Sequence, residues 1–432
     1  MAGKRAQKNP AGAPHIAIAS RIFVPEPAAA SFRLRALVQA LVEKGAAVEV
    51  LTAQLPASLK NIPVNLPQAV QIKRAPVLRD STGYIKGYMQ YMSFDIPLFF
   101  RLLFGRKYDA VVCEPPPTTG FFTRIACTLR RTPYVYYAAD IWSDAAAASA
   151  PKAVVAALRW VEKRALRGAR EVLAISDGVA RRVRELGAQR VAVVPNGIDT
   201  DAFSWEGERK AGVFFVYAGT SSEWQGAEVF AEAMKTVVQQ WPHARLIYVG
   251  SGSADGAIAE IARELPQGTI EQLGRVSADE AAAWQRSAVA ALVSIKPGLG
   301  YDFAMPTKVY SALACGTPVI YAGVGPLTQV ITDEHFGEAV AYDTDAVTQA
   351  MLRMLENATA CGAGCGDAPD AEKPHARGDS EAVGVTHSHT GVTLAQAERT
   401  EKLRRRQWVL DYRSLALTGK KAAETVLDMA RR

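Results

Sequence analysis

Short apolar runs that alternate with helical segments are the feature that most restricts how this chain can fold. Between the first two runs, residues 31–44 carry leucine and valine at helical spacing, and Gly45 ends that helix. Strand, helix and strand in succession form a βαβ unit, and their repetition predicts a doubly wound parallel sheet. In the first half of the chain the runs span residues 15–20, 48–52, 109–114, 134–140, 171–176 and 190–195.

A second series of the same kind follows a polar stretch without periodicity near residues 203–210. At 432 residues, the chain is longer than one hydrophobic core usually supports. We therefore predict an N-terminal α/β domain over residues 14–205 and a C-terminal α/β domain over residues 206–356. The runs of the second series span residues 213–219, 245–250, 269–274, 289–295 and 317–322.

Three segments lie outside this alternation. Residues 1–13 form a short arm that we expect to be disordered, and residues 394–432 form a basic helical segment that we expect to pack back on the N-terminal domain. Residues 357–393 are rich in Ala, Gly, Asp, His and Thr, which favours a flexible insertion. The insertion holds two cysteines and three histidines. Their spacing matches no common structural zinc site, so we expect no metal.

The composition is that of an ordinary globular protein with a positive charge. Hydrophobic residues make up 49% of the chain and charged residues 22%, and the net charge is +7. A positive charge suits anionic partners such as nucleotide diphosphates or acidic lipid surfaces, and we find no nucleic-acid-binding motif. The five cysteines are scattered, which favours a reducing compartment. No apolar run reaches the roughly 18 residues of a transmembrane helix, and we find no signal peptide, so we expect a cytoplasmic protein.

The stretch from Pro306 to Gly316 predicts a short helix that begins at a binding site. Proline suits the first turn of a helix, and Gly316 followed by Pro318 is a typical stop. A helix N-terminus presents N–H donors and a partial positive charge, and Lys308 lies in its first turn. We therefore predict that Lys308 holds a phosphate or diphosphate there, although a solvated lysine at a helix start has the same local pattern.

Polar residues follow several predicted strands of the N-terminal domain. In doubly wound sheets ligands bind at the carboxyl ends of the strands, where Glu114, Asp140 and Asn196 fall. Asp140 is the best carboxylate candidate, with a helix N-cap or a strand-end turn as the alternative, and Asn196 is better explained by a turn. Residues 21–30, after the first strand, lack the glycine spacing of a dinucleotide site. We therefore expect no nicotinamide or flavin cofactor.

Residues 84–106 form an aromatic segment that also carries cations. The pattern predicts either core packing or a surface that lies against an anionic membrane or a lipid-linked acceptor. Its members include Tyr84, Tyr88, Tyr91, Phe94, Phe99, Phe100 and Phe104, with Lys86, Arg101 and Arg106 among them.

Five motifs occur in a fixed order along the chain: Ser176-Asp-Gly, Pro195-Asn-Gly-Ile-Asp199, Tyr217-Ala-Gly-Thr220, Tyr248-Val-Gly-Ser-Gly252, and the stretch from Pro306-Thr-Lys308 to Pro318-Val-Ile320. Together they resemble the successive signatures of retaining glycosyltransferases of family 4. The resemblance covers nearly the whole chain apart from the arm and the insertion. It implies an α/β protein with the GT-B fold, in which two Rossmann-like domains face each other across a cleft.

The closer likeness is to one branch of that family. Residues 114–120 and 140–144 are similar to the proline-rich loop and the Asp-Leu-Trp-Pro-Glu element of the branch that builds bacterial capsule, exopolysaccharide or O-antigen chains. Members of this branch transfer a hexosyl-type sugar from a nucleotide donor to a growing, commonly lipid-linked, acceptor. The resemblance therefore implies a cytoplasmic enzyme, peripheral on the inner face of the plasma membrane.

The resemblance also implies roles for individual residues. Lys308, Asp140 and Glu114 are the expected catalytic residues, and Lys308 would stabilise the charge on the departing diphosphate. In a retaining enzyme without a nucleophilic carboxylate, the leaving phosphate itself takes the acceptor proton on the same face. The nucleotide sugar is then a co-substrate, and no cofactor or metal is expected. The expected donor contacts are Gly219, Thr220, Ser221, Gly250, Gly252, Glu271, Pro306, Thr307 and Lys308, and the expected acceptor contacts are Pro116, Trp142 and Asn196. For Glu271, a solvent-facing strand end is an equal alternative.

Three departures from the family pattern keep other functions open. Phe303 and Ser311 stand where members often carry two glutamates, and Thr220 and Gln225 stand near the usual arginine and lysine. Lys308 would then carry the donor-side charge alone. The alternatives are a non-catalytic GT-B protein that binds a nucleotide or a partner enzyme, and a sugar-nucleotide epimerase, which needs acid and base carboxylates but no second substrate.

Overall fold

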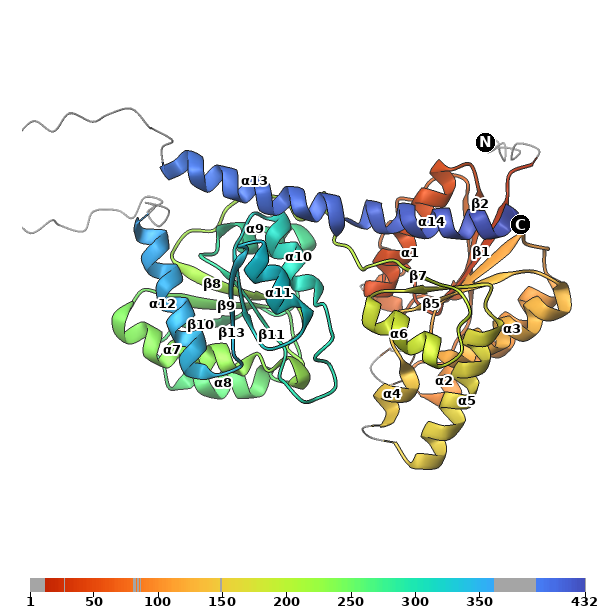
Figure 1. Cartoon of the computed structure of the whole chain (residues 1–432), viewed down its shortest axis with the longest axis horizontal. Helices are drawn as coiled ribbons and strands as arrows, with labels where there is room; N and C mark the ends of the chain where they lie inside the picture. Colours follow the sequence, from red (N-terminus) through yellow and green to blue (C-terminus); the bar gives the residue numbers. More distant parts are fainter. Residues whose placement is uncertain are drawn as a thin grey trace, which may run out of the picture. The chain divides into compact units, whose positions relative to one another are not determined.

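The computed structural model describes residues 12–26, 28–80, 83, 85, 87–147, 150–360 and 394–431. These residues form two compact units (Figure 1). The first unit ends at Gly197 and resumes at Arg413, and the second unit runs from Ile198 to Tyr412. Most of the predicted N-terminal arm and most of the predicted insertion, with its cysteines and histidines, lie outside the described residues.

The first unit is built on a parallel sheet of seven strands in the order β3-β2-β1-β4-β5-β6-β7. In its register, Ile16 of β1 is paired with Val48 on one side and with Ala110 on the other. The strand order reverses between β1 and β4, which is the switch point where ligands bind in sheets of this type. The strands are β1 His15–Ala19, β2 Ala47–Ala53, β3 Val70–Ala75, β4 Ala110–Cys113, β5 Tyr134–Ala138, β6 Glu171–Ala174 and β7 Val191–Val193.

Helices cover both faces of this sheet (Figure 1). On one face, Leu37 of α1 and Val426 of α14 share a core with Ile18. On the other face, Leu98 of α2 shares a core with Tyr136. Burial on both sides explains why the central strands are almost continuously apolar. The helices are α1 Ala29–Glu43, α2 Tyr88–Phe104, α3 Pro117–Arg130, α4 Trp142–Ala147, α5 Lys152–Gly168, α6 Asp177–Glu185 and α14 Leu415–Arg431, with a 3-10 turn η1 at Ala57–Leu59.

The second unit is built on a parallel sheet of six strands in the order β10-β9-β8-β11-β12-β13. Its switch point lies between β8 and β11. The strands are β8 Phe214–Ala218, β9 Arg245–Val249, β10 Ile270–Gln272, β11 Ala291–Ser294, β12 Val319–Ala322 and β13 Gly337–Val340. The helices are η2 Glu223–Gln225, α7 Glu228–Gln240, α8 Asp255–Arg263, α9 Ala278–Ser287, α10 Thr307–Ala314, α11 Pro326–Asp333, α12 Thr344–Ala360 and α13 Leu394–Tyr412.

The predicted α/β class, with two doubly wound parallel sheets, is confirmed. The sequence did not reveal β3 or β13, which are edge strands of their sheets. Exposed positions alternate with half-buried ones in β3, where Gln71 and Lys73 face solvent. An edge strand of this kind lacks the apolar run that marks a buried strand.

The structure divides the chain between residues 197 and 198, not between residues 205 and 206. Ile198 and Phe203 pack against the core of the second unit, although the stretch around them is polar. The C-terminal segment is also shared, because α13 belongs to the second unit and α14 to the first. Val409 of α13 is buried in the second core and Val426 of α14 in the first, so the C-terminal segment belongs to the first unit only from Arg413 onward.

The basic character of α13 serves local structure. Arg404 donates to the Glu334 carbonyl at the end of α11, at 2.7 Å, and Arg405 donates to the carbonyl of Gly316 just beyond α10, at 3.0 Å. Arg406 donates to Ala314 O, the last carbonyl of α10, at 3.2 Å. These guanidinium groups satisfy carbonyls that a helix leaves unpaired at its C-terminus. In the part of the chain that the structure describes, no helix is both long enough and apolar enough to cross a bilayer.

Candidate donor and acceptor sites

Two glycine-rich loops approach each other closely at the carboxyl ends of β8 and β9. Gly219 (φ +125°) and Gly250 (φ +132°) adopt backbone conformations that other residues avoid. A Cβ on Gly250 would lie 2.1 Å from the backbone oxygen of Gly219, and one on Gly252 would lie 2.4 Å from Ser221 O. A Cβ on Gly219 would lie 2.8 Å from Lys308 Cε. These glycines therefore allow the two loops and the Lys308 side chain to meet at one point.

Lys308 reaches that point from the first turn of α10. Pro306 is the residue before the helix and Thr307 is its first residue, one position later than the sequence pattern suggested. Lys308 Nζ donates to Tyr217 Oη and to the Thr220 carbonyl, both at 2.5 Å, and it lies 3.9 Å from the centre of the Tyr217 ring. All the expected donor residues except Glu271 thus lie near Lys308, on adjoining loops and at the helix start. This place is beside the switch point of the second sheet.

The electrostatics of Lys308 favour an anionic ligand. Burial lowers the pKa of the ammonium well below its usual value, although the residue as a whole keeps some exposure. Its partners in the described part of the chain are neutral oxygens. The first N–H groups of a helix also lack intrahelical partners and carry a partial positive charge. A phosphate oxygen placed here would supply the missing counter-charge and raise the pKa again.

The turn after β8 is closed by neutral contacts where the family resemblance suggested cations. Gln225 Oε1 accepts hydrogen bonds from Thr220 Oγ1 at 3.2 Å and from the Ser222 backbone N–H at 3.1 Å. Ser221 Oγ donates to Asp255, whose other oxygen accepts from Gly252 N. The hydroxyl of Ser221 therefore fixes the loop, and the backbone of Ser221 is the part of this residue that is suited to a ligand.

The two positions of the expected glutamates have different environments. Phe303 is 51% exposed, whereas Ser311 is buried. Ser311 Oγ donates to the Lys308 carbonyl at 2.9 Å and accepts from Gln285 Nε2 at 3.1 Å. Ser311 is thus part of the support of α10, and neither position supplies a carboxylate.

Glu271 does not join the donor residues. Its carboxylate pairs with Arg245 at 2.5 Å. Arg245 is the first residue of β9, at the opposite end of that strand from Gly250. This pairing fits the strand-end alternative, and the ribose contact stays a prediction.

An aromatic pair borders the same loops and was not recognised from the sequence. Trp224 of η2 and Tyr301 stack with their ring centres 4.5 Å apart. The Trp224 carbonyl also accepts from Lys296 N, just after β11. A stacked pair leaves no periodic signal, because its two members come from loops 77 positions apart, between residues 224 and 301.

In the first unit, Glu114 lies directly after β4 in a buried ion pair. Arg33 of α1 donates to both of its carboxylate oxygens, at 2.9 and 3.1 Å. Arg33 also donates to Asn196 Oδ1 at 3.2 Å and lies 4.8 Å from the Tyr137 ring centre. Burial raises the pKa of Glu114, and the charge of Arg33 opposes this rise. Burial acts to lower the pKa of Arg33, but Glu114, Tyr137 and Asp140 together outweigh it and raise that pKa. Arg33 thus connects two of the predicted residues, Glu114 and Asn196. The sequence did contain a signal for this role, because Arg33 is a charged residue on the apolar face of its helix.

Asp140 follows β5 and is exposed. It is not the N-cap of α4, because Glu162 of α5 accepts from the backbone N–H groups of Trp142 and Ser143 at 2.9 and 3.1 Å. The Asp140 carboxylate makes no hydrogen bond with the residues that the structure describes. Desolvation by neighbouring atoms raises the pKa of Asp140, and the charge of Arg33 opposes this. Asp140 therefore remains available to a ligand.

Arg21, two residues after the end of β1, was not predicted from the sequence. It is only 6% exposed, and its guanidinium lies 4.2 Å from the Tyr91 ring centre and 6.0 Å from that of Trp142. Its Nε has no hydrogen-bond partner among the described residues. Burial lowers the pKa of Arg21, while Tyr91 and Asp95 act to raise it. Arg21 and Glu114 follow β1 and β4, so this group lies at the switch point of the first sheet.

Two further residues complete the first site. Asp95 of α2 is fully buried and accepts from Thr119 Oγ1 at 2.5 Å, and burial raises its pKa to about 6. Pro116 is buried as the residue before α3. Pro116 therefore shapes the start of that helix, and its place beside an acceptor stays a prediction.

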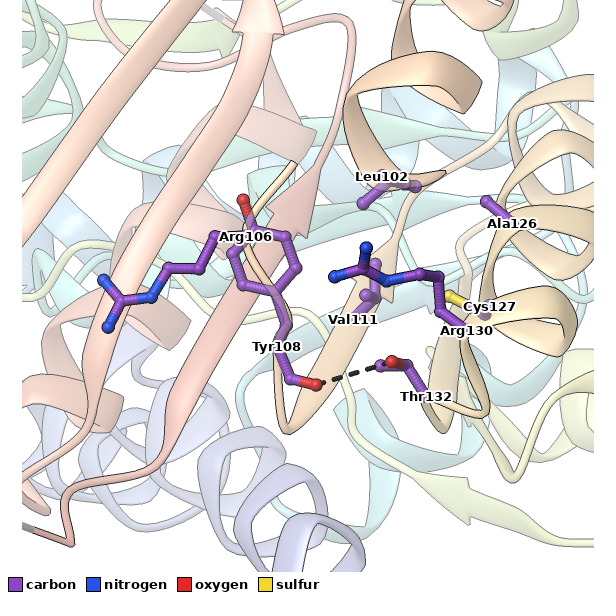
Figure 2. Close-up of a pocket in the computed structure, with 8 residues that line it drawn as sticks. All are labelled: Leu102, Arg106, Tyr108, Val111, Ala126, Cys127, Arg130 and Thr132. Atoms are coloured by element: carbon purple, nitrogen blue, oxygen red, sulfur yellow. Dashed lines mark hydrogen bonds between the residues drawn. The ribbon is translucent and has the colours of Figure 1, made fainter. Parts of the chain in front are cut away.

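Two hollows elsewhere do not suit a nucleotide sugar. The crevice in Figure 2 has a volume of about 10 Å³, room for about one water, and is lined by residues such as Arg106, Cys127 and Arg130. In the second unit a hollow of about 510 Å³ is lined by five acidic residues, among them Glu206 and Glu280, against the two basic residues Lys210 and Arg286. The excess of acidic charge would repel a diphosphate.

Comparison with known proteins agrees with this geometry. The model of a glycosyl transferase 4-like domain matches residues 29–197, and the model of glycosyl transferases group 1 matches residues 212–357. A phosphatidyl-myo-inositol mannosyltransferase of Mycobacterium tuberculosis is 29% identical over 201 residues, which cover 43% of this chain and 50% of the relative. This chain thus spans about half the length of the curated relatives it matches.

Solved structures share the fold. Sucrose-phosphate synthase from Thermosynechococcus elongatus matches with a TM-score of 0.65, at 17% identity, over 97% of this chain and 98% of the other. Anabaena Alr3699/HepE, solved in complex with UDP-glucose, matches with a TM-score of 0.62, at 15% identity, over 96% of this chain and all of the other. With one family model on each α/β unit and this shared GT-B fold, the chain belongs to the family 4, group 1 glycosyltransferases.

Proposed function

We propose that this protein is a retaining glycosyltransferase that moves a sugar from a nucleotide-diphosphate donor to a glycan or lipid-linked acceptor. The observation that carries the proposal is Lys308, a desolvated cation with neutral partners at a helix start beside the switch point. The UDP-glucose bound to Alr3699/HepE supports a donor of this class. The matched mannosyltransferase is named for a phosphatidyl-myo-inositol acceptor, which supports a lipid-linked one.

In the proposed donor site, Lys308 and the backbone of Gly219, Thr220 and Ser221 hold the diphosphate. When the bond to the anomeric carbon breaks, negative charge grows on the departing phosphate oxygen. A fixed cation and helix N–H groups then stabilise the transition state more than the bound donor. The same phosphate oxygen takes the proton of the acceptor hydroxyl, so that the new bond forms on the face that the old one leaves.

In the proposed acceptor site, Asp140 orients the acceptor hydroxyl and Trp142 lies beside the sugar. Arg33 holds Glu114 and Asn196 in place, and Glu114 acts through this ion pair and not on the substrate. We further propose that the reaction belongs to bacterial surface-polysaccharide or glycoconjugate synthesis, on the cytoplasmic side of the membrane. The similarity of residues 114–120 and 140–144 to that branch supports this pathway.

The test is turnover with a panel of nucleotide sugars, with and without lipid-linked saccharide acceptors. We expect release of the nucleoside diphosphate to require an acceptor, apart from slow hydrolysis, and the product to keep the anomeric configuration of the donor in its NMR coupling constants. Inversion would refute the proposed mechanism. Conversion of the nucleotide sugar alone would identify an epimerase instead.

The second candidate is a non-catalytic GT-B protein that binds a nucleotide or a partner enzyme. Phe303 and Ser311, which place no carboxylate beside α10, favour it. It predicts nucleotide binding without turnover under any of these conditions.

A further inference from the structure

We infer that the outer face of α2, α3 and α5 in the first unit binds the surface of an anionic lipid bilayer. This inference goes beyond the proposed transfer reaction, because the face contains none of the proposed donor or acceptor residues. Three features carry it: an exposed apolar stripe on α2, a row of aromatic rings that continues across α3 to α5, and an excess of Lys and Arg over acidic residues on the three helices.

The stripe on α2 is the first feature. Met89, Ile96, Phe100 and Phe104 share one side of the helix, since they are spaced by seven, four and four residues. All four are exposed, and Phe104 keeps 75% of its surface. The opposite side already faces the core through Leu98 and its neighbours. A helix that is apolar all round is normally buried on all sides or lies against a membrane.

The row of rings is the second feature. α3 packs between α2 and α5, so the three helices form one layer over the sheet (Figure 1). Neighbouring ring centres along this layer are 5.2 to 6.2 Å apart. At its end, Trp160 of α5 is 52% exposed, and the guanidinium of Arg164 lies 5.1 Å from its ring centre. The rings in order are Phe104, Phe100, Phe99, Phe122, Phe121 and Trp160.

The charge of these helices is the third feature. They carry eight Lys or Arg residues, one on α2, two on α3 and five on α5. They carry only two acidic residues, Asp95 and Glu162, and both are buried. No acidic side chain is therefore exposed on any of the three helices. Aromatic groups flanked by cations match the interface of a bilayer with anionic headgroups.

A bilayer fits this face better than a second protein. The stripe ends in exposed rings, and Arg164 lies beside the exposed Trp160 ring of the same layer. Long cations of this kind reach headgroups when the rings enter the acyl boundary. Tyr84 and Lys86, which the sequence analysis included in this segment, lie outside the described residues.

The test is co-sedimentation of the full chain with vesicles of phosphatidylcholine and phosphatidylglycerol at 7:3, against vesicles of phosphatidylcholine alone. We expect binding to the anionic vesicles that weakens as salt rises, because exposed charges are screened. The variant Phe100→Ser with Phe104→Ser should bind roughly tenfold more weakly. The variant Lys152→Glu with Arg164→Glu should bind at least roughly 25-fold more weakly, because each basic residue contributes about fivefold near an anionic surface.

Matched controls change similar residues elsewhere in the first unit. Ile62→Ser removes an apolar side chain that is 45% exposed, and Lys420→Glu with Lys421→Glu reverses two exposed charges on α14. Both should bind vesicles like the wild type. All variants should keep the wild-type circular dichroism and the thermal shift caused by nucleotides, since the donor site lies in the second unit. A failure of the proposed function would thus appear in the nucleotide shift and not in the vesicle binding.

Three outcomes would overturn the inference. The first is that the wild type does not sediment with the anionic vesicles at low salt. The second is that both surface variants bind as tightly as the controls. The third is that the protein is a dimer in solution and the Phe100→Ser, Phe104→Ser variant is a monomer, which would assign the face to a second copy of the chain.

Discussion

Replacing Lys308 by methionine should separate the stability of the ligand-free protein from its response to nucleotides. Methionine keeps the apolar stem of the side chain and removes the ammonium, whose pKa is lowered by burial. In the wild type the unfolded chain binds this proton more readily than the folded chain. The charge therefore opposes folding below the folded-state pKa, and stability rises as the pH increases from that pKa toward the unfolded value.

The partners of Lys308 do not lose all their hydrogen bonds in this variant. Tyr217 Oη still donates to the Thr220 carbonyl at 3.1 Å. We therefore expect the ligand-free Lys308→Met protein to be at least as stable as the wild type at neutral pH. A marked loss of stability would mean that Lys308 is a structural residue, and would refute the reasoning.

The response to a nucleoside diphosphate should change in the opposite direction. A charge-assisted hydrogen bond contributes about 1.5–3 kcal/mol, which corresponds to a roughly 10- to 150-fold change in Kd. A ligand at a hundredfold excess over Kd stabilises the folded protein by about 2.7 kcal/mol, and after a hundredfold loss of affinity the same concentration gives only about 0.4 kcal/mol. The shift in Tm should thus fall from roughly 5–11 °C to about 1–2 °C.

The assay is thermal unfolding of both proteins with and without UDP, GDP or ADP. Lys235→Met is the matched control, because Lys235 is a surface lysine of the same unit that pairs with Glu232 and Glu264. The control should keep the full nucleotide shift. In the wild type, affinity should also fall about tenfold per pH unit above the pKa of Lys308 in the ligand-free protein, since binding then requires uptake of a proton. An equal nucleotide shift in Lys308→Met would contradict the donor site.

Three further substitutions test the remaining structure. Glu114→Gln should destabilise the first unit by about 3 kcal/mol, because it leaves the Arg33 charge buried without its counter-ion, and adding Arg33→Met should restore most of this in urea unfolding followed by circular dichroism. Gly250→Ala should abolish most nucleotide binding, because its Cβ would lie 2.1 Å from a backbone oxygen of the loop after β8, whereas Gly256→Ala, with nothing within 4 Å, should bind normally in calorimetry. Burial raises the pKa of Asp95 to about 6, so the folded state binds this proton more tightly than the unfolded state. As the pH rises from 4 to 6, ionisation of Asp95 therefore lowers the stability of the wild type by roughly 3 kcal/mol. Asp95→Asn should remove this loss of stability. An unchanged pH dependence of Tm in that variant would show that another group titrates.

The sequence predicts the fold well because its signals are local. Each central strand is an apolar run that ends at a glycine or a polar residue, and these ends must converge in a parallel sheet. Gly219 and Gly250 meet for that reason, and Lys308 joins them from the first turn of α10. The edge strand β3 escaped prediction because exposed positions interrupt its apolar run, and β13 because half its short length is Gly337 and Glu338.

The sequence by itself determined the two parallel sheets and the set of residues at their carboxyl ends. Only the tertiary structure decided which side chains pair: Arg33 with Glu114, 81 positions away, and Glu271 with Arg245 at the far end of its strand. It also decided that the rings of α2, α3 and α5 form one exposed face. The physical reason is that periodicity records which side of an element is apolar, whereas a charged or aromatic side chain finds its partner through distances between elements that are remote in the chain.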